Sequence, residues 1–396
     1  MIENQLIRII ELTGQGNSPS AQDYEYLKQD LLKTQKGSRG LFIKDLLRFD
    51  IGEIAEIDTI DTIDTIVSQR SQILQLTCRE IAQVLESQNI QLKTSSNLSL
   101  ILWYYWIPLA QRLANQQQSI GRTLIQGLLG GQGTGKTTLG IVLKVLLGHL
   151  GKTFLSISLD DLYKTYADRQ KLRDRRPELI WRGPPSTHDI DLGIEVLQQL
   201  RDRPSTNPQP IVIPRFDKSL HNGAGDRTAP EISNGADIVL FEGWFVGMRP
   251  LPISAFRNFI PPILSESDRD FALECNANLY DYLPLWDYLD SLIVLIPEDY
   301  QYSLQWRLES EHKLIASGKT GMSDQEITEF VEYFWKALHP ELFMPHLLGT
   351  HGKYKSSDRL LGDLINPAIS DRPPIDLVIE ISRSHLPNFE QMLNEA

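Results

Sequence analysis

The run GGQGTGKT at positions 130–137, which matches the pattern G-x-x-x-x-G-K-[ST], constrains the fold of this chain more than any other feature. An apolar run, LIQGLL, precedes it, and apolar residues at helical spacing follow it over Thr138–Leu147. This order of strand, glycine-rich loop and helix is the context in which the pattern binds phosphate. The sequence therefore predicts a phosphate-binding loop between a buried strand and a helix.

The residue types of this loop suit the phosphate groups of ATP. Glycines let backbone N–H groups face inward, and the helix beginning near Lys136 points its positive end at the same place. We expect Lys136 to reach the β- and γ-phosphates and the Thr137 hydroxyl to bind Mg²⁺. The alternative is a glycine-rich turn without a ligand. The expected nucleotide-binding residues are Gly130, Gly131, Gln132, Gly133, Thr134, Gly135, Lys136, Thr137 and Thr138.

Short apolar runs alternate with longer helical segments from Thr123 onward. Near-continuous apolar runs separated by helices are typical of a parallel sheet covered on both faces. We therefore predict a doubly wound α/β domain with a mostly parallel sheet over residues 96–396. The expected strands are Thr123–Leu129, Thr153–Leu159, Ile211–Ile213, Asp237–Phe241, Ser291–Ile296 and Asp376–Ile381.

Residues 1–95 are expected to form a helical N-terminal extension. Apolar residues recur at helical spacing in three segments, near Leu6–Ile10, Tyr24–Leu32 and Leu41–Phe49. A triple Ile-Asp-Thr repeat follows at 57–65, and a period of three fits neither a strand nor a helix well. We interpret the repeat as a tolerant surface segment, with a helix whose apolar stripe drifts as the alternative.

Four adjacent aromatic residues, Trp103 to Trp106, lie in a second helical candidate, Leu98–Ala114. Such a cluster can form a platform for stacking bases, but no basic residues accompany it. We therefore expect a buried helix.

The composition excludes several classes of partner. The formal net charge is −12, so no broad positive field attracts nucleic acid or an anionic membrane surface. The apolar stretch Ile101–Leu109 is far shorter than the roughly 20 residues of a membrane-spanning helix. The N-terminus lacks the features of a signal peptide, and the two cysteines, Cys78 and Cys275, form no disulfide framework. A cytoplasmic protein is the expectation, and no feature of the sequence indicates an oligomeric state.

Carboxylates follow two of the predicted strands. Glu242 ends the run that starts at Asp237. A carboxylate at such a position holds Mg²⁺ beside a nucleotide, and we expect Glu242 to do so through a water. Asp160 and Asp161 end another strand, whose carboxyl end should lie near the γ-phosphate. We expect Asp160 to accept the proton of an attacking hydroxyl. An alternative role for either aspartate is to cap a helix from Leu162 onward.

The strand followed by Asp-x-[Phe/Leu]-Tyr resembles the uridine kinase, phosphoribulokinase and pantothenate kinase group. Further blocks within about 125–340 resemble the D-glycerate 3-kinases of that group: Arg182–Asp189, Ile213–Ser219, Glu242–Leu251 and Trp306–Glu311. The resemblance implies ATP-dependent phosphorylation of D-glycerate to 3-phosphoglycerate. It also implies a lid around 300–325 that brings Arg307 over the transferring phosphate; an ordinary surface arginine is the alternative.

Glycerate carries a carboxylate, for which an arginine with fixed geometry is the best partner. The candidate substrate residues lie in loops rich in glycine and proline. Structural ion pairs are the alternative for each of them, and a helix cap is the alternative for the His-Asp pair. The candidates are His188, Asp189, Arg215, Lys218 and Arg227.

Two rival functions remain open. One is a related kinase that acts on a nucleoside, pantothenate or a sugar phosphate. The other is a regulatory P-loop ATPase, which needs a positioned water instead of a base beside an anion pocket.

Overall fold

A five-stranded sheet forms the centre of the computed structural model, with the strand order β2-β7-β1-β8-β9. Every neighbouring pair in this sheet is parallel. The structure describes residues 2–36, 60–90, 98–202, 209–316, 318, 321–349 and 375–387. The strands of the sheet are β1 (Leu124–Gly130), β2 (Phe154–Ser158), β7 (Ile238–Gly243), β8 (Ser291–Pro297) and β9 (Ile375–Ile381).

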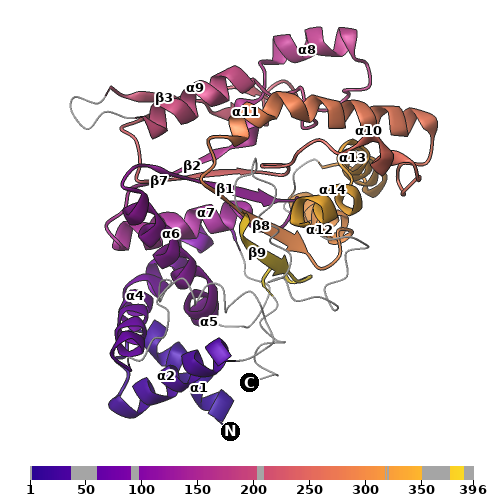
Figure 1. Cartoon of the computed structure of the whole chain (residues 1–396). Coiled ribbons are helices and arrows are strands. Elements are labelled where there is room, and N and C mark those ends of the chain that lie inside the picture. The colour runs from indigo at the N-terminus through magenta and orange to yellow at the C-terminus, as the bar shows by residue number, and fades with distance from the viewer. Residues whose placement is uncertain are drawn as a thin grey trace.

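Helices cover both faces of the sheet, as the apolar runs predict (Figure 1). Side chains alternate between the faces, so Ile238 and Leu240 of β7 join one hydrophobic core while Val239 and Phe241 join the other. The helices α6 and α7 lie on the first face, and α9, α10 and α11 lie on the second. The predicted doubly wound α/β fold is confirmed.

The helices of the α/β part include one short π-helical turn, Leu102–Trp106, between α5 and α6. Among the described residues, no helix has the length and apolar character needed to cross a membrane. The helices are α5 (Leu98–Ile101), α6 (Ile107–Ile120), α7 (Lys136–His149), α8 (Tyr166–Arg175), α9 (Ile190–Arg201), α10 (Glu266–Asn278), α11 (Leu283–Trp286), α12 (Tyr302–Ala316), α13 (Asp324–Ala337) and α14 (Pro340–Leu348), with 3₁₀ turns at Leu159–Leu162, Ile253–Phe256 and Leu279–Tyr282.

One of the predicted strands, Ile211–Ile213, does not belong to the parallel sheet, so this part of the prediction is wrong. Ile211–Ile213 forms β3, which pairs antiparallel with β6 (Glu231–Ser233) in a separate two-stranded ribbon. Its central residue, Val212, is 53% exposed, so only one face of this strand is buried. A half-exposed strand suits an antiparallel ribbon, whereas a parallel strand is buried on both faces. A second small ribbon joins β4 (Phe216–Asp217) to β5 (Asp226–Arg227).

The N-terminal helices pack against the α/β part and share its hydrophobic core. They are α1 (Ile2–Gly14), α2 (Ala21–Lys36) and α4 (Ile60–Ser87), and α4 packs along α7 (Figure 1). The first two predicted helical segments are confirmed, and Leu41–Phe49 lies outside the described residues. The described helices of the extension therefore share one hydrophobic core with the sheet.

The described part of the Ile-Asp-Thr repeat begins α4, which favours the helical alternative over an irregular surface segment. Ile63 packs against the core, while the neighbouring Asp64 forms an ion pair with Lys28 of α2. This helix is 28 residues long and contacts both α1 and α2.

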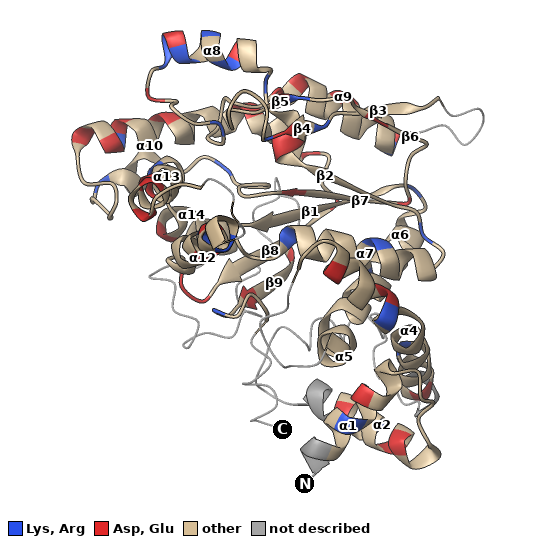
Figure 2. Ribbon diagram, turned by 180° about the vertical axis from the view of Figure 1, so that it is seen from behind, with Lys and Arg blue, Asp and Glu red and all other residues tan. Residues whose placement is uncertain are grey.

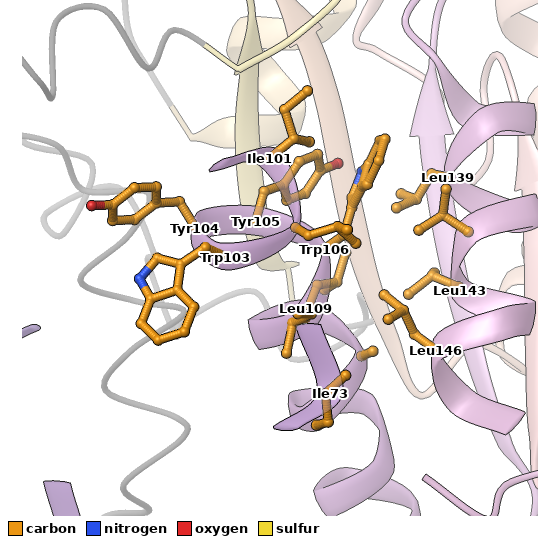
Figure 3. Packing of buried hydrophobic residues seen from close by; sticks show 14 of the residues in the cluster. Ile73, Ile101, Trp103, Tyr104, Tyr105, Trp106, Leu109, Leu139, Leu143 and Leu146 are labelled. Carbon is orange, nitrogen blue, oxygen red and sulfur yellow. The ribbon is translucent and has the colours of Figure 1, made fainter. Parts of the chain in front are cut away.

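The predicted burial of the four adjacent aromatic residues is confirmed. They lie in the π-helical turn, where the backbone N–H of Ile107 donates to the carbonyl of Leu102, five residues earlier. Each is no more than 5% exposed. Tyr105 and Trp106 face α7, while Trp103 and Tyr104 point away from it (Figure 3).

Candidate active site

The phosphate loop lies between β1 and α7, where the sequence predicts it. Gly135, at φ +87°, immediately precedes the first residue of α7, Lys136. Gly133 has φ +81°, and a Cβ there would lie 2.6 Å from the ring of Trp306, so both backbone conformation and space require glycine. The loop thus has the backbone needed to direct N–H groups inward.

Lys136 folds back over this loop. Its Nζ donates hydrogen bonds to the carbonyl oxygens of Gly130, at 2.6 Å, and Gly131, at 3.0 Å. Burial lowers the pKa of Lys136, although the nearby carboxylates of Glu242 and Asp160 oppose that effect. The ammonium group is therefore held at the centre of the site, beside two carboxylates.

Glu242 lies near the end of β7, beside β1, and faces the lysine. Its Oε2 is 4.0 Å from Nζ of Lys136, and its side chain is 14% exposed. Burial raises the pKa of Glu242, and the positive charge of Lys136 partly counteracts the rise. Parallel pairing explains the proximity, because the carboxyl ends of neighbouring strands meet at one edge of the sheet.

The two consecutive aspartates after β2 have different environments. Asp161 completes a capping box: its Oδ2 accepts from the backbone N–H of Ser158 at 3.0 Å. The same oxygen accepts from Arg215 at 2.8 Å, and Oδ1 accepts from the backbone N–H of Phe216 at 3.3 Å. These contacts indicate that Asp161 stabilises the local structure. The 3₁₀ turn that it caps begins at Leu159, whereas the sequence predicts a capped helix from Leu162 onward.

Asp160, in contrast, borders the site. Its Oδ2 lies 2.5 Å from Nζ of Lys218. Burial disfavours the charged carboxylate, but Lys218 and a hydrogen bond from Tyr163 outweigh it and hold the pKa of Asp160 below its usual range. The carboxylate is consequently ionised at neutral pH.

A cavity of about 890 Å³ brings these groups together. Its polar lining comes from separate segments and includes Lys136, Thr137, Asp160, Lys218 and Glu242. Aromatic side chains form another part of the wall. They are Tyr163, Tyr166, Trp181, Trp244, Phe330 and Phe334.

Arg307 also lines this cavity, on α12 after β8. Its guanidinium lies 2.9 Å from Glu311 and 5.9 Å from the centre of the Phe330 ring. Glu311 in turn accepts a hydrogen bond from the backbone N–H of Met322 at 2.9 Å. This chain of contacts ties α12 to the segment that leads into α13.

Four of the five candidate substrate residues do not border the cavity in this structure; Lys218 does. Arg215 pairs with Asp161 and with Glu231. Arg227 pairs with Asp189 at 2.7 Å, and Asp189 also caps α9 by accepting from the backbone N–H of Leu192. In this structure, the three residues therefore form the ion pairs and the helix cap that are the alternatives to a role in substrate binding.

His188, the fourth, is completely buried. Its Nδ1 and the hydroxyl of Tyr282 share a hydrogen bond of 2.7 Å, and its ring stacks on Tyr163 at 4.5 Å. Burial lowers the pKa of His188 to about 3, so the ring is neutral at physiological pH. It supports Tyr163, which in turn hydrogen-bonds Asp160.

Sequence reasoning missed three arginines that do line the cavity, Arg169, Arg173 and Arg182. Arg169 and Arg173 belong to α8, a helix with alternating charges (Figure 2). Arg182 donates to the carbonyl of Gly223 at 2.6 Å and lies 5.9 Å from the Tyr163 ring. The sequence contained a signal for Arg182, because this residue begins the block Arg182–Asp189 that resembles the D-glycerate 3-kinases.

No family model matches this chain. It is 32% identical over 246 residues to the chloroplastic D-glycerate 3-kinase of Arabidopsis thaliana, covering 60% of this chain and 51% of the plant protein. The chain thus spans about half the length of that relative. It is 33% identical over 230 residues to an uncharacterized kinase of Schizosaccharomyces pombe, covering 56% of this chain and 82% of the relative.

A solved structure of a D-glycerate 3-kinase from Cryptococcus neoformans has a similar fold. The TM-score is 0.56 at 27% sequence identity, and the match covers 72% of this chain and 95% of that chain. The matches to this structure and to the fission-yeast kinase therefore extend over most of each of those proteins.

Proposed function

We propose that this chain, which belongs to the family of P-loop kinases that includes the D-glycerate 3-kinases, transfers the γ-phosphoryl group of ATP to D-glycerate. The products are ADP and 3-phosphoglycerate. The observation that carries the proposal is the cavity in which Asp160, Lys136 and Glu242 lie together beside cationic side chains. The acceptor is proposed from the names of the plant and Cryptococcus relatives.

The loop residues fit a nucleotide with Mg²⁺. Lys136 would neutralise charge on the β- and γ-phosphates, while the Thr137 hydroxyl and Glu242 would hold the metal. Among the described residues, no group of three or more His, Cys, Asp or Glu side chains could hold a metal. Mg²⁺ commonly takes only one or two protein ligands and fills its shell with phosphate oxygens and water.

Asp160 is proposed as the general base. The hydroxyl oxygen of the acceptor forms a bond to the γ-phosphorus, and the bond from that phosphorus to the bridging oxygen of ADP breaks. The hydroxyl proton passes to the Asp160 carboxylate. Because the transition state is loose, this proton leaves late, and a carboxylate of low pKa is adequate. Arg307 lines the same cavity and would balance charge on the transferring group.

Arg182 is our candidate for binding the acceptor carboxylate. It lines the cavity near Tyr163, the neighbour of Asp160, and its one hydrogen bond among the described contacts goes to Gly223. A guanidinium carries five N–H donors, so four remain, and a bidentate bond to a carboxylate needs two of them. Lys218 lines the same cavity but already pairs with Asp160.

One other observation favours a bulkier acceptor. A volume of about 890 Å³ with several aromatic walls would also accommodate a nucleoside or pantothenate. A regulatory P-loop ATPase has less support, because Asp160 lies inside a cavity lined with cations.

An ADP-release assay with D-glycerate, glycerol, uridine and pantothenate tests the proposal. We expect ADP release to depend on D-glycerate and the wild-type chain to phosphorylate it at the 3-hydroxyl, as ³¹P and ¹³C NMR of the product would show. Turnover of uridine or pantothenate with no turnover of D-glycerate would support the bulkier acceptor. ADP release that is independent of every acceptor would support the ATPase.

A further inference from the structure

A second cavity, of about 440 Å³, borders the phosphate loop. It shares Lys136 and Thr137 with the acceptor cavity, so the first turn of α7 lies between the two. The second cavity also borders Gly133 to Leu139, but it contains neither Asp160 nor Glu242. The loop is therefore open to a chemically distinct space on each side.

The direction in which the triphosphate must run indicates which cavity holds the acceptor and which holds the nucleoside. The γ-phosphate must lie beside Asp160, where the hydroxyl is deprotonated. The rest of the nucleotide must then leave the loop on another side, and the 440 Å³ cavity borders Lys136 and Thr137 on such a side, with a wall beyond the loop. A third cavity, of about 390 Å³, touches Gly131, Gln132 and Thr134 but reaches neither of those two residues.

We propose that the N-terminal part of the chain forms one wall of the nucleoside pocket, through Asn89, Ile90, Tyr105 and Trp106. This inference rests on the proposed use of ATP. All four residues border the 440 Å³ cavity. Asn89 and Ile90 lie two and three residues after the end of α4, so the extension would contribute to nucleotide binding as well as to packing.

The opposite wall comes from the C-terminal half. Trp306 of α12 packs over Gly133, and the His385 ring stacks on Trp306 at 4.6 Å. The Nδ1 of His385 and the carbonyl oxygen of Gly133 share a hydrogen bond of 2.7 Å. A base in this cavity thus lies between walls from two distant parts of the sequence, and the half-buried His385 ring is available to stack on it.

Asn89 adds a polar group that suits a purine. Its side chain is exposed at the end of α4, and an asparagine amide can donate to N7 and accept from N6 of adenine. The predicted ligand is therefore a purine nucleoside with adenine preferred.

The π-helical turn provides a matched pair of substitutions. Trp103 and Trp106 are both at most 2% exposed and belong to one turn, but only Trp106 borders the cavity. Figure 3 shows Trp106 beside Leu139 of α7, whereas Trp103 points the other way. Trp103→Leu and Trp106→Leu should therefore disturb packing similarly and differ at the pocket.

The test is calorimetric titration of the full chain with Mg²⁺·ADP and, separately, with pyrophosphate, which lacks a nucleoside. We expect Trp106→Leu, which removes most of a side chain that forms the wall of the cavity, to weaken ADP binding about tenfold and to leave pyrophosphate binding unchanged. Trp103→Leu should leave both affinities unchanged. ADP affinity equal to wild type in Trp106→Leu would overturn the inference, as would equal loss of ADP and pyrophosphate.

A second variant covers the case in which Trp106→Leu does not fold. Ile90→Trp adds bulk at a half-buried position on the cavity, so it should weaken ADP binding and spare pyrophosphate. Unchanged ADP binding in Ile90→Trp would also overturn the inference. Neither titration contains an acceptor, so a wrong assignment of glycerate would leave this result intact.

Discussion

The two adjacent aspartates provide the sharpest test of the proposed chemistry. Asp160→Asn and Asp161→Asn are the same change at neighbouring positions, and each keeps the size of the side chain. The first removes the proposed base from the cavity, and the second removes charge from a structural hydrogen-bond cluster. We expect the first variant to lose rate and the second to lose stability.

The magnitudes follow from the contacts. Loss of a general base lowers kcat by about 10²–10⁴. Asp160 pairs with Lys218, whose side chain is 60% exposed, so breaking this pair should hardly affect the free energy of unfolding. Asp161 is 15% exposed and accepts a charge-assisted bond from Arg215, and such a bond contributes about 1.5–3 kcal/mol. Arg215 retains Glu231, so the lower end, about 1.5 kcal/mol, is expected.

Two measurements separate these effects. A coupled assay of ADP release at saturating ATP and D-glycerate gives kcat, and urea denaturation gives the free energy of unfolding. ADP affinity, measured by calorimetry, should stay close to wild type in Asp160→Asn. The reasoning is refuted if Asp161→Asn is the slow enzyme while Asp160→Asn retains most of its kcat.

Three further predictions concern other positions. Lys136→Ala should abolish phosphoryl transfer and leave the circular dichroism spectrum unchanged; a folded variant with wild-type kcat would contradict the kinase assignment. Arg182→Ala should raise KM for D-glycerate without changing KM for ATP, whereas Arg227→Ala should lower only Tm; glycerol, which lacks the carboxylate, should react about 10⁴-fold less efficiently. His188 has a pKa of about 3 when folded, below its ordinary value of about 6.5, so its contribution to stability is complete above that value and is lost as pH falls toward 3. Urea denaturation between pH 4 and 7 should show a shallower pH dependence for His188→Gln than for wild type, and equal slopes would contradict this role.

Much of the fold and the centre of the site could be predicted from the sequence, because their signals are local. The phosphate loop is one continuous run between an apolar strand and a helix. Glu242 and Asp160 each end an apolar strand, and parallel pairing brings such ends to one edge of a sheet. Their place at the same edge as the phosphate loop therefore follows from the strand patterns, while the strand order β2-β7-β1 decides their distance from Lys136.

Only the tertiary structure decided which charged side chains form ion pairs with each other and which face the cavity. Arg215 lies 54 positions from Asp161 and Arg227 lies 38 positions from Asp189, and no local pattern shows that these pairs meet. Arg182 reaches the cavity because the loop after α8 folds over it. The sequence gives the charge of each residue, but long-range packing decides which residue it pairs with. A charged side chain pairs with an opposite charge that the fold brings within a few ångströms.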